Sequence, residues 1–212
     1  MQPTRPPEGN SGYGNVYDFP VSDSALLTST GSSLTQNQSS ALHRKHRIAI
    51  LIDGASLFYA ALQLQIEVDY LKLLVHLKND RPLLRAYFYT GIDRANDRQQ
   101  GFLLWMRRNG YRVITKDLIT LPDGSRKANM DVEMAVDMLM LGNYCDTLVL
   151  LSGTGDLNYA VDTLSYRGVK IELFSLRANT NEQLINLADR FIDLNDIKHL
   201  IRKTSDESVD LK

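Results

Sequence analysis

The sequence predicts an α/β fold: a doubly wound three-layer sandwich with a mainly parallel five-stranded sheet. Two runs, Ile48–Ile52 and Leu148–Leu151, are apolar at every position, which is typical of parallel strands covered on both faces. Strand-like and helix-like segments then alternate along the chain, as they do in βα units. At 212 residues and 43% apolar content, the chain can bury one sizeable core.

One domain is expected at residues 45–203, between two tails. Residues 1–44 hold four of the six prolines and eight serines, so they bury too little apolar surface to offset the entropy of ordering. Residues 204–212 are polar and are expected to be a second disordered tail. The basic cluster at 43–47 marks the first boundary, either as a solvated segment or as a contact for RNA.

The hydrophobic pattern places the elements in order. Main strands are predicted at Arg47–Ile52, Leu84–Thr90, Tyr111–Thr115, Thr147–Ser152 and Val169–Phe174. Helices are predicted at Leu57–Leu62, Tyr70–Leu77, Asp93–Asn109, Asn129–Leu141, Leu157–Arg167 and Thr180–Leu187. The turn signal at residues 122–124 favours a small hairpin within Leu118–Lys127. A short strand at Arg190–Leu194 and a helical turn at Ile197–Arg202 close the domain.

Composition excludes several classes of protein. With 24 basic and 25 acidic side chains, no global field draws the chain to nucleic acid or membrane, so such binding requires a local patch. Cys145 is the only cysteine, which excludes an intrachain disulfide and a cysteine metal site. No run approaches the roughly 20 apolar residues of a membrane span, and the N-terminus lacks a signal peptide. We therefore expect a soluble, cytoplasmic protein with no membrane partner.

Two aspartates follow the apolar strands. Asp53 ends the first strand before Gly54, and Asp156 ends the small-residue turn after the strand at 147–152. Each is equally consistent with a turn or helix-cap aspartate. However, parallel strands place both carboxylates on one edge of the sheet, and in the common order 3-2-1-4-5 these strands are neighbours at the switch point where ligands bind.

A third carboxylate opens the helix that leads into the strand at 147–152. Asp131 shares a face with Met134 and Met138 at helical spacing. An acid on an apolar face is costly without a cation beside it, although helix-start electrostatics beside a capping Asn129 also accounts for it. Glu133 and Asp137 share another face, where a solvated stripe is the favoured interpretation.

Together the three acids predict a divalent cation site. Converging carboxylates repel one another unless a hard cation lies among them, and ligation by oxygen alone indicates Mg²⁺ or Mn²⁺. Such an ion activates water and stabilises a phosphoryl transition state. A dinucleotide fingerprint fails because Asn158 replaces its third glycine, and an Asp-x-Asp phosphatase pair fails because Leu51 replaces an acid. The four histidines lie away from these strand ends, so histidine-based catalysis finds no support.

Basic, aromatic and hydroxyl-bearing residues near this edge are candidates for RNA contact. They are Ser56, Tyr59, Arg94, Arg98, Lys116, Arg126 and Lys127. Tyr89 and Tyr87 are further candidates for stacking on unpaired bases. The alternative is that the charges only solvate the surface and that Tyr87 or Tyr89 alternates into the core.

Four motifs in order resemble a known family. They are Ile52-Asp53-Gly54, Asn129–Asp137, Ser152–Asp156 and the run from Ala188 to Leu194. Across residues 47–203 the chain resembles the LabA-like branch of the NYN domains, in the PIN-like nuclease superfamily. The resemblance implies a PIN-like, Rossmann-like fold and a metal-dependent ribonuclease that hydrolyses RNA phosphodiester bonds. It assigns Asp53, Asp131 and Asp156 as catalytic and metal-binding residues.

Two departures from the family pattern favour an alternative. Thr154 stands where the first aspartate of a Ser-Gly-Asp-x-Asp motif is usual, and Ser56 where asparagine is common. Neither hydroxyl adds negative charge, so metal affinity is expected to fall, and Thr154 would orient a water instead. The alternative is a catalytically impaired regulator of gene expression that binds RNA, or binds a protein partner through its tails. Some cyanobacterial members of the family resemble such regulators, of the clock-output type.

Overall fold

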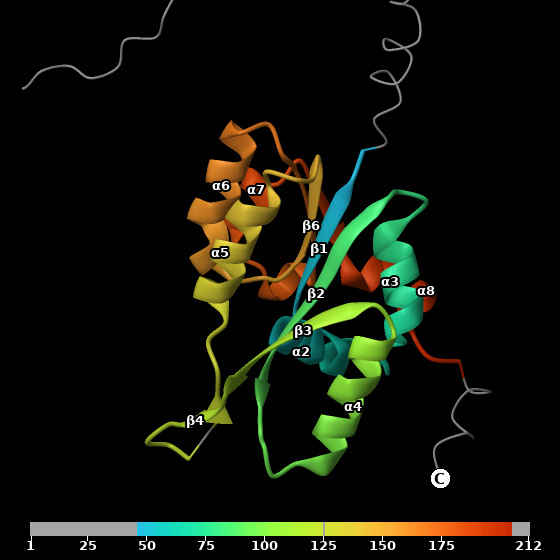
Figure 1. Cartoon of the computed structure of the whole chain (residues 1–212), viewed down its shortest axis with the longest axis vertical. Helices are drawn as coiled ribbons and strands as arrows, with labels where there is room; N and C mark the ends of the chain where they lie inside the picture. The colour runs from blue at the N-terminus through green and yellow to red at the C-terminus, as the bar shows by residue number, and fades with distance from the viewer. Residues whose placement is uncertain (1–45, 125, 205–212) are drawn as a thin grey trace, which may run out of the picture. The chain divides into compact units, whose positions relative to one another are not determined.

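A computed structural model describes residues 46–124 and 126–204 and shows a parallel sheet at their centre (Figure 1). Its strand order is β3-β2-β1-β6-β7-β8, and every neighbouring pair is parallel. The strands are β1 (Ile48–Asp53), β2 (Leu83–Ile92), β3 (Tyr111–Asp117), β6 (Thr147–Leu151), β7 (Lys170–Ser175) and β8 (Arg190–Asp193). The predicted α/β class is confirmed, as is the order 3-2-1-4-5 for its first five strands.

The prediction of five strands in the sheet is wrong by one. The short segment Arg190–Asp193 pairs in parallel with β7, from Glu172 opposite Arg190 to Ser175 opposite Asp193. Arg190 is exposed and the other three residues are only partly buried, so their sequence lacks the continuous apolar run that identified the other strands. The carboxylate of Asp189 also accepts the backbone N–H of Ile171 at 2.7 Å, which joins the start of β8 to β7.

Helices cover both faces of the sheet. One layer contains α2 (Gly54–Leu64), α3 (Tyr70–Lys78), α4 (Asp97–Arg108) and α8 (Leu194–Ile201), and the other contains α5 (Asp131–Leu141), α6 (Asn158–Tyr166) and α7 (Glu182–Leu187). Along β1, Ile48, Ile50 and Ile52 enter the first core, whereas Ala49 and Leu51 enter the second. This two-sided burial explains why the strand is apolar at every position.

The start of α2 brings the helix directly to the end of β1. Two single-turn helices follow the other strands less directly: η1 (Gly155–Leu157) comes after β6 and the turn at 152–154, and η2 (Arg177–Asn179) comes after β7 and Leu176. Helix α2 begins at Gly54, three residues before the predicted start. A Cβ at Gly54 would lie 2.7 Å from the carbonyl oxygen of Tyr89, so only glycine lets the chain turn this close to β2. The side chain of Asp53 therefore lies at the joint between strand and helix.

A two-stranded hairpin follows β3, as predicted. Strands β4 (Ile119–Thr120) and β5 (Arg126–Lys127) pair antiparallel, with Ile119 opposite Lys127. The hairpin projects from the body of the domain close to the start of α5 (Figure 1). It carries two of the basic residues expected to contact RNA.

Several expectations fall outside the described residues. These are the two disordered tails, apart from residue 204, and the first part of the basic cluster, residues 43–45. In the described ranges, no helix is both long and apolar enough to cross a bilayer.

Candidate metal and nucleic-acid site

The candidate site lies at the carboxyl ends of β1 and β6. These strands are hydrogen-bonded neighbours, from Ile48 opposite Thr147 to Ile52 opposite Leu151. Helix α5 packs against both β1 and η1. Three segments that are far apart in the sequence, ending in Asp53, beginning with Asp131 and turning at Asp156, therefore meet at this edge.

Asp53 is held rigidly by its neighbours. Its Oδ1 accepts the backbone N–H of Ala55 at 3.0 Å, which caps α2. Its Oδ2 accepts the Ser56 hydroxyl at 2.5 Å and the Ser152 hydroxyl at 3.5 Å. Asp53 thus has the cap role that its position indicated, and its carboxylate orientation is fixed by donors from two strand ends.

Ser152 is a residue of the site that the sequence reasoning missed. Its side chain is fully buried, its hydroxyl donates to Asp53, and its oxygen accepts the backbone N–H of Thr154 at 3.4 Å. A serine directly after the apolar run Leu148–Leu151 was the available signal, because a buried hydroxyl requires hydrogen-bond partners. Ser152 connects the β6 turn to the Asp53 carboxylate.

Thr154 shapes the turn that carries Asp156. Its hydroxyl oxygen accepts the backbone N–H of Asp156 at 3.2 Å and caps η1. Asp156 itself is exposed. Thr154 therefore performs the turn-stabilising part of an aspartate's role without contributing a charge to the site.

The pKa of Asp131 is raised by burial and by the charges of the other two carboxylates. Burial is the largest cause that raises the pKa of Asp131, opposed by a hydrogen bond from Asn129, and the charges of Asp156 and Asp53 raise the pKa further. Asn129 also accepts the backbone N–H of Asp131 at 2.8 Å, but the N-cap residue of α5 is Met130 and not Asn129, so the predicted cap is wrong by one position. The charges of Asp53 and Asp156 therefore act on the Asp131 carboxylate.

The donor set suits a hard cation, but it does not form a closed cage. The candidate ligands at this edge are carboxylate and hydroxyl oxygens, which Mg²⁺ and Mn²⁺ prefer. Within residues 46–124 and 126–204, no three His, Cys, Asp or Glu side chains are spaced to hold a metal ion. The chemistry of the residues fits an ion held by one or two carboxylates with water completing its shell, as Mg²⁺ commonly is.

Three of the five basic residues expected to contact RNA are in ion pairs. Arg94 pairs with Asp117 at 2.9 Å, Lys116 with Glu133 at 2.7 Å, and Arg126 with Asp93. Lys116 also donates to the carbonyl of Asn129 at 3.1 Å, so it anchors the start of α5. Arg98 and Lys127 are exposed and form no ion pair with another described residue.

The aromatic residues expected to stack on bases differ in exposure. Tyr59 is 62% exposed on α2, next to the site. Tyr89 is completely buried, and Tyr87 is 8% exposed, so the proposal that they stack on bases is wrong and the core alternative holds. Their rings stack on each other with centroids 6.0 Å apart.

Glu133 and Asp137 do not form the expected solvated stripe. Glu133 binds Lys116, which lowers the pKa of Glu133, and its other carboxylate oxygen is buried without a hydrogen bond among the described residues. Asp137 accepts the buried Tyr89 hydroxyl at 2.8 Å. Helical spacing identified their shared face correctly, but it could not show that β2 and β3 supply partners.

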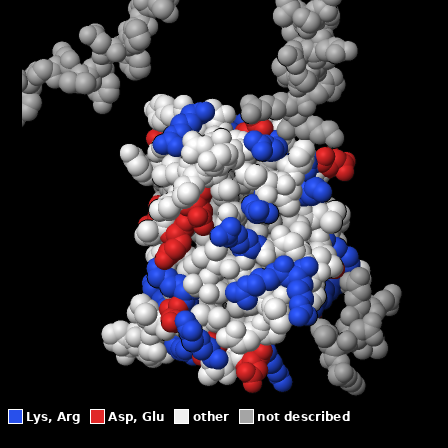
Figure 2. Space-filling view, viewed as in Figure 1, with Lys and Arg blue, Asp and Glu red and all other residues white. Residues whose placement is uncertain are grey.

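Charge is distributed unevenly around this part of the molecule. Figure 2 shows acidic side chains gathered over α5 and basic side chains beside and below them, over β3 and α4.

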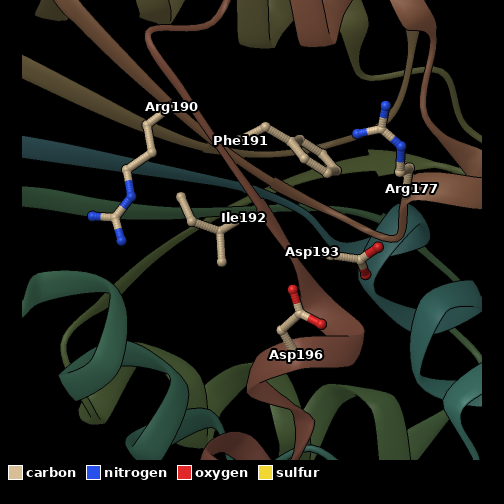
Figure 3. Close-up of a pocket in the computed structure, with 6 residues that line it drawn as sticks. All are labelled: Arg177, Arg190, Phe191, Ile192, Asp193 and Asp196. Atoms are coloured by element: carbon tan, nitrogen blue, oxygen red, sulfur yellow. The ribbon is translucent and has the colours of Figure 1, made fainter.

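The last sequence motif, Ala188–Leu194, has a different role. Asp193 caps α8 by accepting the backbone N–H of Asn195 at 2.8 Å. A cavity of about 400 Å³ beside β8 is lined by Arg177, Arg190, Phe191, Ile192, Asp193 and Asp196. In Figure 3 the Arg177 guanidinium lies beside the Phe191 ring, 5.6 Å from its centroid, and Arg190 points away from it. None of the three site aspartates lines this cavity, so the motif organises the sheet edge.

Comparisons with known proteins agree with this geometry. Residues 47–195 match the NYN domain. Low amplitude and bright protein LabA from Synechococcus elongatus is 37% identical over 170 residues, which cover 76% of this chain and 90% of LabA. A crystal structure of a protein of unknown function from Vibrio parahaemolyticus superposes with a TM-score of 0.66 at 25% identity, covering 76% of this chain and 98% of that one.

Proposed function

The chain belongs to the NYN domain family and is LabA-like, and from this premise we propose that it is a ribonuclease that hydrolyses RNA phosphodiester bonds with Mg²⁺ or Mn²⁺. Membership of this PIN-like nuclease family supports a nuclease-like or regulatory function. One observation carries the enzymatic proposal: three carboxylates from separate segments meet at the switch point of a parallel sheet.

Each residue then has a distinct task. Asp53, Asp131 and Asp156 are the candidate ligands: one or two of them would bind the ion directly and the others through water, and the bound ion would lower the pKa of water and neutralise charge on the phosphate. Ser56 and Ser152 fix the Asp53 carboxylate through their hydrogen bonds, and Thr154 fixes the turn before Asp156. Arg98 and Lys127, whose charges are not neutralised by a described acid, would hold the RNA backbone together with exposed Tyr59.

RNA cleavage tests this proposal. The full chain is incubated with end-labelled single-stranded RNA and Mn²⁺, beside Asp53→Asn and the surface control Asp162→Asn on α6. Cleavage that needs Mn²⁺, persists in Asp162→Asn and is lost in Asp53→Asn is expected. Equal cleavage by all three proteins would mean that the activity comes from a contaminant and that the assignment is wrong.

A second function, an impaired RNA-binding regulator, is favoured by Thr154. Its hydroxyl caps η1 and brings no charge to the carboxylates. Thr154→Asp keeps an oxygen for this cap and adds the fourth acid. A large gain of Mn²⁺-dependent cleavage would place the natural protein in the impaired class, whereas unchanged cleavage would show that the site works without that acid.

A further inference from the structure

A small pocket opens beside Asp53, between α2 and the ends of β6 and β7. Its volume is about 300 Å³, at the lower end of the roughly 300–1,000 Å³ typical of small-molecule sites. The lining residues are Ser56, Tyr59, Ala60, Gln63, Gly153, Ser175, Leu176 and Asn179. We propose that this pocket binds one unpaired base of an RNA strand, with Tyr59 stacking on the base and the Gln63 and Asn179 amides reading its edge. The choice of RNA as the ligand rests on the proposed nuclease function.

The pocket and the carboxylate site share a wall. Ser56 lines the pocket while its hydroxyl donates to Asp53 at 2.5 Å. Gly153, another lining residue, lies between Ser152, which also donates to Asp53, and Thr154. A base in the pocket would therefore belong to a nucleotide at or next to the phosphate that lies on the carboxylates.

The lining selects a neutral ligand. None of the eight lining residues carries a charge, so the pocket offers nothing to balance a phosphate. Tyr59, Ala60 and Leu176 supply apolar surface, and serine hydroxyls and two amides supply hydrogen bonds. A nucleobase has this combination of flat apolar faces and a polar edge.

Two amides are placed to read that edge. Asn179 donates through Nδ2 to Gln63 Oε1 at 2.8 Å, and Gln63 Nε2 donates to Asn179 Oδ1 at 3.4 Å. Each amide nitrogen has two protons and each oxygen two lone pairs, so the pair keeps donors and acceptors for a ligand. Amide side chains discriminate bases through such paired contacts.

The backbone around the pocket is fixed. A Cβ at Gly153 would lie 2.6 Å from the Asn179 carbonyl oxygen and 3.1 Å from Ser175 Oγ, so the β6 turn packs directly against η2. The Gly153 carbonyl also accepts the backbone N–H of Asn181 at 2.9 Å. Asn179 is consequently held in place by main-chain contacts, which a residue that reads a base requires.

Tyr59 supplies a stacking face at the rim. Its ring is 62% exposed and touches Phe58 edge-on, with centroids 5.6 Å apart. The exposure of Tyr59 leaves ring surface available for a base. Loss of a stacking aromatic weakens binding of a base by about tenfold.

Binding of single nucleosides tests the pocket without any cleavage. Adenosine, cytidine, guanosine and uridine are titrated separately into the full-length chain in EDTA, and protein amide shifts are followed by NMR. The variants are Tyr59→Ala and Gln63→Leu, which removes the amide; the controls are exposed Tyr166→Ala on α6 and Leu62→Ala on α2. All four sites are solvent-exposed, and thermal melting verifies folding.

We expect one nucleoside to bind more tightly than the others and to shift the Gln63 and Asn179 amide signals. Tyr59→Ala should weaken binding about tenfold, Gln63→Leu should remove the preference, and both controls should match the unmodified chain. Equal binding of all four nucleosides, or unchanged affinity in Tyr59→Ala, would overturn the base pocket even if the chain cleaves RNA. Selective binding without any Mn²⁺-dependent cleavage would retain the pocket and refute the nuclease proposal alone.

Discussion

Replacing Tyr89 with phenylalanine should destabilise the domain without affecting RNA binding. The Tyr89 ring is completely buried and stacks on Tyr87, while its hydroxyl donates to Asp137 Oδ2 at 2.8 Å. Phenylalanine preserves the ring packing and removes only this hydrogen bond. The substitution therefore isolates the bond that connects β2 to α5, the helix that begins with Asp131.

The magnitude follows from the kind of bond and its surroundings. A hydrogen bond to a charged group contributes about 1.5–3 kcal/mol to stability. Asp137 is half-buried, so water replaces part of the lost bond, and we expect the free energy of unfolding to fall by about 1–2 kcal/mol. For a domain of this size that corresponds to a Tm lower by roughly 2–8 °C.

Urea unfolding and thermal melting of Tyr89→Phe give the assay, with Tyr166→Phe on the exposed surface of α6 as the control. The double variant with Asp137→Asn should lose less than the sum of the single changes, because both remove the same bond. Unchanged stability together with weaker RNA binding would refute this reasoning and return Tyr89 to a base-stacking role.

Three further outcomes are expected. In chemical denaturation, Gly54→Ala should lower the free energy of unfolding by about 1–3 kcal/mol, because its Cβ would overlap the β2 backbone. Gly101→Ala, with open space in α4, should raise it by about 0.5–1 kcal/mol. Equal effects of the two substitutions would contradict the close approach of Gly54 to β2. Burial, and then the charge of Glu67, raise the pKa of Tyr70 to about 12. The free energy of unfolding should therefore fall as the pH rises above about 10, where the tyrosine of the unfolded chain ionises. Tyrosinate absorbance should show that Tyr70 ionises only with unfolding, and ionisation of Tyr70 near pH 10 in the folded protein would contradict this. Lys127→Gln should weaken RNA binding and reduce the slope of log affinity against log salt concentration by about one. Arg94→Gln should have a smaller effect, because Arg94 is already ion-paired. The reverse ranking in a salt titration would exclude the hairpin as an RNA contact.

Continuous apolar runs were enough to predict most of the sheet. The residues of β1 are buried on both faces and alternate between two cores. The continuous apolar run therefore indicated both a parallel strand and its central place in the strand order. β8 could not be inferred as part of the sheet, because its residues are half-exposed and its pairing with β7 depends on a tertiary contact through Asp189.

The positions of the candidate site residues were predictable where a carboxylate follows the end of a strand. Asp53 and Asp156 lie at one edge because parallel topology places strand ends there, and Asp131 joins them because α5 packs against β1 and η1. The partners of side chains were not predictable: only the folded chain shows that Lys116 binds Glu133. Likewise, alternation along β2 left Tyr89 equally suited to the core or the surface, and its burial decides between the two.

The most direct test of the account is a melting experiment with Mn²⁺. An ion that binds only the folded state should stabilise it, by about 2.7 kcal/mol at a hundredfold excess over the dissociation constant. Millimolar Mn²⁺ should therefore raise the Tm of the unmodified chain, and the rise should disappear in Asp53→Asn and in Asp156→Asn. A Tm that does not respond to Mn²⁺, with no heat of binding in calorimetry, would contradict the claim that these carboxylates form a cation site.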